Sequence, residues 1–132
     1  MQQLHITGNF DVKLTPQVTA PAMAGAKLAR QTLDKTFHGD LEAHSLGEML
    51  ATFTEVKGSA GYVAMERVTG TLLGKKGSFV LMHTGVMNRG ASQLTVQVVP
   101  DSGTDELVGL IGQMGIQVTD GKHVYTFDFN LR

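Results

Sequence analysis

The chain has no cysteine, only 3 prolines among 132 residues, and no run of lysine and arginine. Without cysteine there is no thiol nucleophile, no thiolate metal ligand and no disulfide, which fits a reducing compartment. Eleven basic and 12 acidic residues give a net charge of -1, which argues against a nucleic-acid partner. The N-terminus lacks a signal-peptide pattern, and no apolar run reaches the length of a membrane span. These absences predict a cytoplasmic protein with no membrane partner.

What is present indicates one ordered domain spanning residues 1–132. Hydrophobic residues make up 42% of the chain and charged residues 17%, a balance that excludes intrinsic disorder. The 16 glycines predict many tight turns between short elements.

Alternation of apolar and polar residues predicts about eight β-strands. The pattern is clearest from Leu4 to Leu14. Residues 15–26 lack a period and predict a long loop, and residues 45–47 predict a bulge. Residues 104–108 predict one helical turn with Thr104 as N-cap. The other strands are expected over residues 27–37, 40–54, 59–73, 76–89, 92–99, 111–119 and 122–131.

Glycine turns predict how the strands pair. If Gly74-Lys75 is a two-residue turn, Glu66 lies directly opposite His83 on an otherwise apolar face. Turns at Lys57-Gly58, Gly90-Ala91 and Asp120-Gly121 place the other apolar residues on the same face. On the opposite face, the Lys57-Gly58 turn pairs Glu48 with Arg67, and a turn at His38-Gly39 pairs Lys35 with Glu42, both as surface ion pairs.

A sheet of this kind, with at most one helical turn to cover its apolar face, must bury that face against itself. We therefore predict an all-β fold, a single closed antiparallel barrel, with a two-sheet sandwich as the alternative. Eight strands leave room for packed side chains or one small ligand, and Ala51, Ala64, Gly70 and Gly85 decide how much space remains.

Four segments resemble the bacterial DUF3224 proteins: Leu33–Ala43, Lys57–Gly70, Gly77–Leu81 and Val98–Gly103. The resemblance spans nearly the whole chain and is most specific in Gly-Tyr-Val-Ala-Met-Glu-Arg-Val-Thr-Gly. It implies a barrel similar to that of allene oxide cyclase. It implies no activity, because the family carries no established one and fold does not fix function.

The candidate site residues lie on the predicted inner face. Glu66 and His83 are candidate catalytic residues as an acid/base pair, and they could equally be a buried pair that fixes strand register. Tyr62, His123 and Tyr125 could orient the polar group of a ligand, although each is also a common core residue. Arg89, beside a turn at the barrel mouth, could receive an anion.

No motif for a metal or cofactor accompanies these residues, so neither is expected. Three functions stay open. The first is binding of a small, mostly apolar ligand in the barrel lumen. The second is an isomerase or cyclase acting on a hydrophobic substrate with Glu66 as base. The third is a filled barrel with a structural role. Outward apolar residues favour a homodimer: Val63, Met65, Val80, Met82 and Val86.

Overall fold

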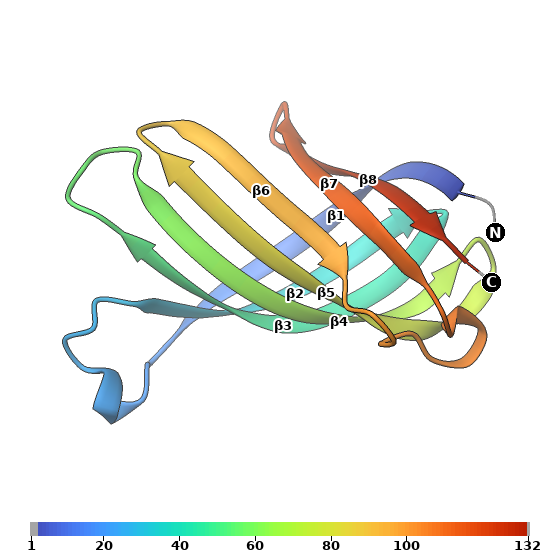
Figure 1. Ribbon diagram of the computed structural model, residues 1–132, viewed down its shortest axis with the longest axis horizontal. Coiled ribbons are helices and arrows are strands. Elements are labelled where there is room, and N and C mark those ends of the chain that lie inside the picture. The colour runs from blue at the N-terminus through green and yellow to red at the C-terminus, as the bar shows by residue number, and fades with distance from the viewer. Residues whose placement is uncertain (1–2, 132) are drawn as a thin grey trace.

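The computed structural model describes residues 3–131 and forms a closed barrel of eight antiparallel strands (Figure 1). Each strand pairs with the next in sequence, and β8 pairs with β1 to close the ring. The all-β fold predicted from alternation is therefore confirmed. The strands are β1 (Gln3–Gln17), β2 (Ala29–Gly39), β3 (Leu41–Phe53), β4 (Ala60–Leu72), β5 (Lys75–Asn88), β6 (Ala91–Val98), β7 (Ile111–Thr119) and β8 (Lys122–Asn130).

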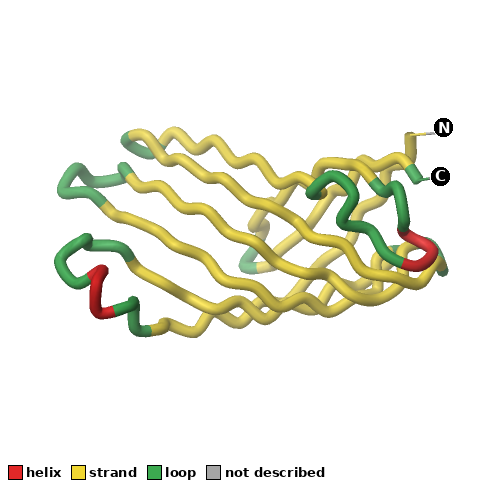
Figure 2. Tube along the Cα trace, turned by 60° about the horizontal axis from the view of Figure 1, so that its bottom comes forward, coloured by secondary structure: helices red, strands yellow, loops and turns green. Residues whose placement is uncertain are grey.

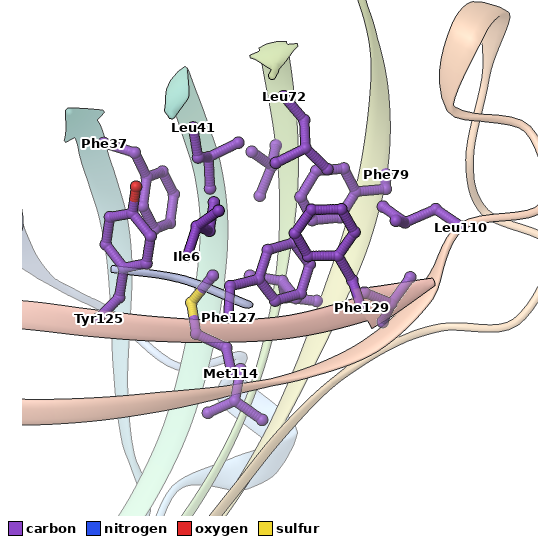
Figure 3. Close-up of a cluster of buried hydrophobic side chains, with 14 of the residues drawn as sticks. Ile6, Phe37, Leu41, Leu72, Phe79, Leu110, Met114, Tyr125, Phe127 and Phe129 are labelled. Atoms are coloured by element: carbon purple, nitrogen blue, oxygen red, sulfur yellow. The ribbon is translucent and has the colours of Figure 1, made fainter. Parts of the chain in front are cut away.

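One half of the barrel, at the end where the chain begins and finishes, is filled with side chains. Two short 3₁₀ turns, η1 (Pro21–Met23) and η2 (Asp105–Leu107), lie at opposite ends (Figure 2). The η2 segment covers the filled end with buried Leu107 and Leu110. Inside, the rings of Phe79, Phe127 and Phe129 stack in series, with centroids 5.9 and 4.8 Å apart (Figure 3). We call this part of the barrel the packed half.

The other half is open, and its inward apolar side chains meet solvent. Phe53 is 77% exposed and Val118 is 64% exposed, although both alternate with outward residues. The strands β6 and β7 pair only at Val96↔Met114 and Gln97↔Gln113 and diverge toward this end (Figure 1). The lumen of this open half is therefore reachable from the end of the barrel.

Two hairpin turns differ from the predicted ones by one position. The turn residues are Leu73-Gly74 and Arg89-Gly90, and all four have positive φ. A type I′ turn requires positive φ at both central residues, and glycine takes the second place. Glu66 therefore lies opposite Leu81, and His83 opposite Ala64, a register two residues from the predicted one. Because side chains alternate with period two, this even shift leaves the predicted inner face unchanged.

The connection from β3 to β4 is longer than the predicted two-residue turn. Phe53 pairs with Ala60, and the Thr54 amide donates to the Ser59 carbonyl across the loop. Glu48 consequently lies opposite Met65, so its predicted pairing with Arg67 is wrong. Its carboxylate instead binds Arg30 of β2.

The predicted pairing of β2 with β3 is wrong, and this error changes which residues form the site. Phe37 pairs with Ala43 and Lys35 pairs with Ser45, three residues from the predicted register. An odd shift exchanges the two faces of a strand. Lys35 therefore points into the barrel, where it is 3% exposed, and the predicted surface pair of Lys35 with Glu42 is wrong.

Three smaller predictions are also corrected. The ladders of β3 run unbroken through residues 45–47, so this segment contains no bulge. Thr104 makes no side-chain cap to the η2 turn, because its hydroxyl accepts from the Ser78 amide instead. Strand β1 continues to Gln17, beyond its predicted end at Leu14, because residues 14–17 pair with β2. Among residues 3–131, no helix is long and apolar enough to cross a membrane.

Candidate functional site

Four polar side chains meet on the inner wall at the border between the packed half and the open half. Lys35 comes from β2, Ser45 from β3, Glu66 from β4 and His83 from β5. Cross-strand pairing sets Lys35 against Ser45, and the alternation of each strand turns all four inward. Each is at most 4% exposed. Four adjacent strands thus build one polar cluster within an apolar wall, which we call the Glu66 cluster.

The carboxylate of Glu66 is the acceptor at the centre of this cluster. Its Oε1 accepts from Ser45 Oγ at 2.7 Å. Its Oε2 accepts from Lys35 Nζ at 2.9 Å and from His83 Nε2 at 2.5 Å. Because an ionised carboxylate only accepts hydrogen bonds, the proton between Glu66 and His83 lies on Nε2. The predicted meeting of Glu66 and His83 therefore occurs, but diagonally across the two strands.

The surroundings of Glu66 favour its charged form. Burial by itself raises the pKa of a carboxyl group, but the hydrogen bond from His83 and the charge of Lys35 outweigh it and lower the pKa of Glu66 to about 2. Glu66 is therefore an anion at neutral pH. A carboxylate with so low a pKa is a weak base.

Neighbouring residues make room for the cluster and shield it. Gly47 lies opposite Glu66, and a Cβ at Gly47 would stand 2.8 Å from the Glu66 Cα. The Lys35 ammonium also lies over the rings of Phe10 and Phe37, with Nζ 4.7 and 5.4 Å from their centroids. Every buried side-chain nitrogen and oxygen in the described part of the chain has a hydrogen-bond partner. The cluster is therefore complete without a ligand.

Tyr62 connects the cluster to the open half. Its hydroxyl oxygen lies 3.4 Å from Nδ1 of His83, on the side of the imidazole away from Glu66. Its ring lies against β5 at Gly85, where an added Cβ would stand 2.2 Å from Tyr62 Cε1. Burial, and then the charge of Glu66, raise the pKa of Tyr62, so its hydroxyl keeps its proton.

A pocket of about 220 Å³ occupies the open half beside Tyr62. It lies along the inner face of β3, β4, β5 and β6, and its surface is almost entirely apolar. Glu66 and His83 are not among its lining residues, and Tyr62 is the member of the hydrogen-bonded chain that borders the pocket. The inward residues that line it are Met49, Ala51, Phe53, Ala60, Tyr62, Gly85, Met87, Ser92 and Leu94.

Comparison with known proteins identifies the family of this barrel. The family model of DUF3224, described as a protein of unknown function, matches residues 6–129. The chain belongs to the DUF3224 family. The crystal structure of a DUF3224 protein of unknown function from Shewanella oneidensis MR-1 is similar to it, with 52% sequence identity and a TM-score of 0.92. The match covers 99% of this chain and 98% of that one. No curated protein matches the chain.

The other predicted ligand-binding residues of this DUF3224 barrel lie apart from Tyr62. Tyr125 is buried in the packed half, where its hydroxyl donates to the His38 carbonyl at 3.0 Å. His123 is half-buried on the inner face of β8, with its ring centroid 5.1 Å from that of Phe10. Arg89 is exposed in the β5–β6 turn at the open end, as predicted, and its amide donates to Ser59 Oγ.

The exposed histidines of this DUF3224 chain lie in separate pairs with carboxylates. Within residues 3–131, no three His, Asp or Glu side chains gather closely enough to hold a metal ion. Three other histidines instead form exposed pairs with a carboxylate: His5 with Asp128, His38 with Asp11 and His44 with Asp34. Exposed pairs of this kind contribute little to stability.

Sequence reasoning missed Lys35 and Ser45. A signal for Lys35 was present, because Leu33, Lys35 and Phe37 alternate with polar residues in a single period of two. Ser45 likewise shares its period with Leu41 and Ala43. The predicted turn at His38-Gly39 concealed Lys35, because it set Lys35 on the outer face, and the predicted bulge at residues 45–47 concealed Ser45.

Proposed function

We propose that this DUF3224 barrel binds a small, mostly apolar molecule in the pocket of its open half. The pocket is the observation that carries this proposal, because its inward wall is apolar except near Tyr62 and Ser92. Binding sites for small molecules typically combine an apolar lining with a few placed polar groups. The adaptable side chains of Met49 and Met87 suit an apolar occupant.

The Glu66 cluster supports this function from the border of the packed half. Glu66 fixes the orientation of the His83 ring by accepting from Nε2, and His83 in turn faces the Tyr62 hydroxyl. Lys35 balances the charge of Glu66 at 2.9 Å. The polar contact with the ligand is therefore assigned to Tyr62, while Glu66 and His83 position it.

The experiment has two parts. Native mass spectrometry of freshly purified protein reveals any molecule that co-purifies with it. Titration with 2-naphthol, followed by its fluorescence, then compares the natural protein with Ala51→Leu, which adds bulk to the pocket wall directly opposite Tyr62. We expect Ala51→Leu to weaken binding at least tenfold. The matched control, Thr36→Leu, adds bulk on the exposed outer face and leaves binding unchanged. Equal binding by all three proteins would show that the pocket is not the site.

An isomerase or cyclase acting on a hydrophobic substrate is the second candidate, favoured by the hydrogen-bonded chain from Tyr62 through His83 to Glu66. With a pKa of about 2, Glu66 suits electrostatic stabilisation better than the role of base. Isomerisation conserves mass. If the barrel is an isomerase, the molecules that co-purify with the natural protein and with the His83→Gln variant should therefore have equal mass. They should differ in their chromatographic retention. Identical molecules would indicate binding alone.

We also propose that the barrel forms a homodimer through the outer face of β3, β4 and β5. Leu50, Val63, Met65 and Val86 are each about half exposed there. A contiguous apolar surface of this kind typically marks an interface, and symmetric dimers are the commonest assembly of identical chains. Light scattering should give the mass of two chains for the natural protein and of one chain for Val63→Lys. A natural protein with the mass of one chain would contradict the proposal.

A further inference from the structure

We infer that the pocket selects apolar molecules that donate a hydrogen bond, such as alcohols and phenols, and that the acceptor is the Tyr62 hydroxyl oxygen. This inference rests on the proposed function, because it names the class of ligand for the same pocket. It follows from the order of donors and acceptors along the chain of contacts that begins at Lys35.

The first step is the charge balance of the Glu66 cluster. Lys35 carries a positive charge and Glu66 a negative one, and Ser45 contributes a neutral hydroxyl. Among the described residues, these and Tyr62 are the ionisable or polar side chains in hydrogen-bond contact with Glu66 and His83. A proton added to His83 would leave an uncompensated positive charge in a buried site, which is costly. The charges of Lys35 and Glu66 are therefore balanced when His83 carries a single ring proton.

The second step is the direction of the hydrogen bonds that a neutral His83 can make. Its one proton lies on Nε2 and is donated to Glu66 at 2.5 Å. Nδ1 consequently carries a lone pair and can only accept. The group that faces Nδ1 at 3.4 Å is the Tyr62 hydroxyl, whose proton is thereby directed to the imidazole.

The third step is what Tyr62 then presents to the pocket. A hydroxyl that donates a hydrogen bond to Nδ1 still offers two oxygen lone pairs. A ligand O–H or N–H can donate a hydrogen bond to one of these lone pairs. A ketone or an ether oxygen has only lone pairs to offer, and these would be repelled by the lone pairs of the Tyr62 oxygen. Gly85 holds this arrangement, because its missing side chain allows the Tyr62 ring to lie against β5, two residues from His83 on the same face. The deep polar end of the pocket is therefore an acceptor.

The test compares three probes that differ only in one polar group: 2-naphthol as donor, 2-methoxynaphthalene as ether and 2-acetylnaphthalene as ketone. In the natural protein we expect 2-naphthol to bind about 3- to 10-fold more tightly than the other two, the effect of about one net hydrogen bond. In Tyr62→Phe this preference should disappear while the two acceptor probes keep their affinity. Circular dichroism and the thermal midpoint of Tyr62→Phe establish that the variant is folded.

The possible outcomes separate this inference from the proposed function. Preference for 2-naphthol that depends on Tyr62 supports both. Equal binding of the three probes, or a preference for 2-acetylnaphthalene that Tyr62→Phe removes, would overturn the donor selectivity and leave pocket binding intact. Absence of binding by all three probes, or binding that Ala51→Leu does not weaken, would overturn the proposed function and this inference with it.

Discussion

Replacing Lys35 by methionine should destabilise the barrel far more than loss of a surface lysine. Methionine keeps the length of the apolar stem but removes the ammonium that donates to Glu66 at 2.9 Å. Removing one partner of a buried ion pair costs about 3–5 kcal/mol, because the other charge is left uncompensated in the interior. Ser45 and His83 still donate to Glu66, so we expect the lower end of this range, about 3 kcal/mol.

Equilibrium unfolding in urea at pH 7 measures this loss, and a double-mutant cycle shows its origin. Glu66→Gln keeps the shape of the side chain and removes its charge, so Lys35→Met combined with Glu66→Gln leaves no unpaired charge. The double variant should therefore be at least 2 kcal/mol more stable than the sum of the two single losses predicts. Lys13→Met, at an exposed position of β1, is the control and should cost less than about 0.5 kcal/mol. A loss below about 1 kcal/mol for Lys35→Met, or additive losses in the cycle, would refute the reasoning.

Two further predictions concern the same region and the turns. Between pH 5 and pH 2 the natural protein should lose about 3 kcal/mol of unfolding free energy through Glu66, because the unfolded carboxyl group binds its proton near pH 4.5 and the folded one only near pH 2. Urea unfolding across this range should show a smaller loss for Glu66→Gln, and equal losses would contradict the assignment. Gly47→Ala should lower the thermal midpoint more than Gly74→Ala. The new Cβ at Gly47 would stand 2.1 Å from the Met65 carbonyl oxygen, whereas Gly74 has open space and only a positive φ of 80°. The reverse order of midpoints would argue against close packing of β3 on β4.

The fold could be predicted from sequence because alternation and glycine turns agree over most of the chain. Asp120-Gly121 was placed correctly, so the register of β7 with β8 was correct throughout, including Ile116 opposite Tyr125. Two other hairpins were misplaced, because a leucine or an arginine takes the first left-handed position of the turn and glycine the second. An error of two residues does not change which side chains face inward. Glu66 and His83 are therefore close to each other, as predicted, although the predicted register was wrong by two residues.

The candidate site was only half predictable for the same geometric reason. The β2–β3 register was wrong by three residues, an odd number, and that error moved Lys35 from the interior to the surface. A lysine is rarely buried unless it is paired, so residue type also argued for the surface. Its partner Glu66 lies 31 positions away in sequence, and no local pattern reports a contact of that range. The role of Tyr62 likewise depends on the opening of the lumen, which strand alternation does not describe.

The short ladder between β6 and β7 determines where the barrel opens locally. Only two residue pairs join these strands, whereas eight pairs join β5 to β6 and nine join β7 to β8. Local opening occurs most readily where the fewest interactions must break, so transient separation of strands should start between β6 and β7. Amide protons of residues 91–95 and 115–119 on the edges that face each other should exchange with deuterium before those of the remaining ladders. The barrel can in this way widen at one side while the Glu66 cluster, held by β2 to β5, stays intact.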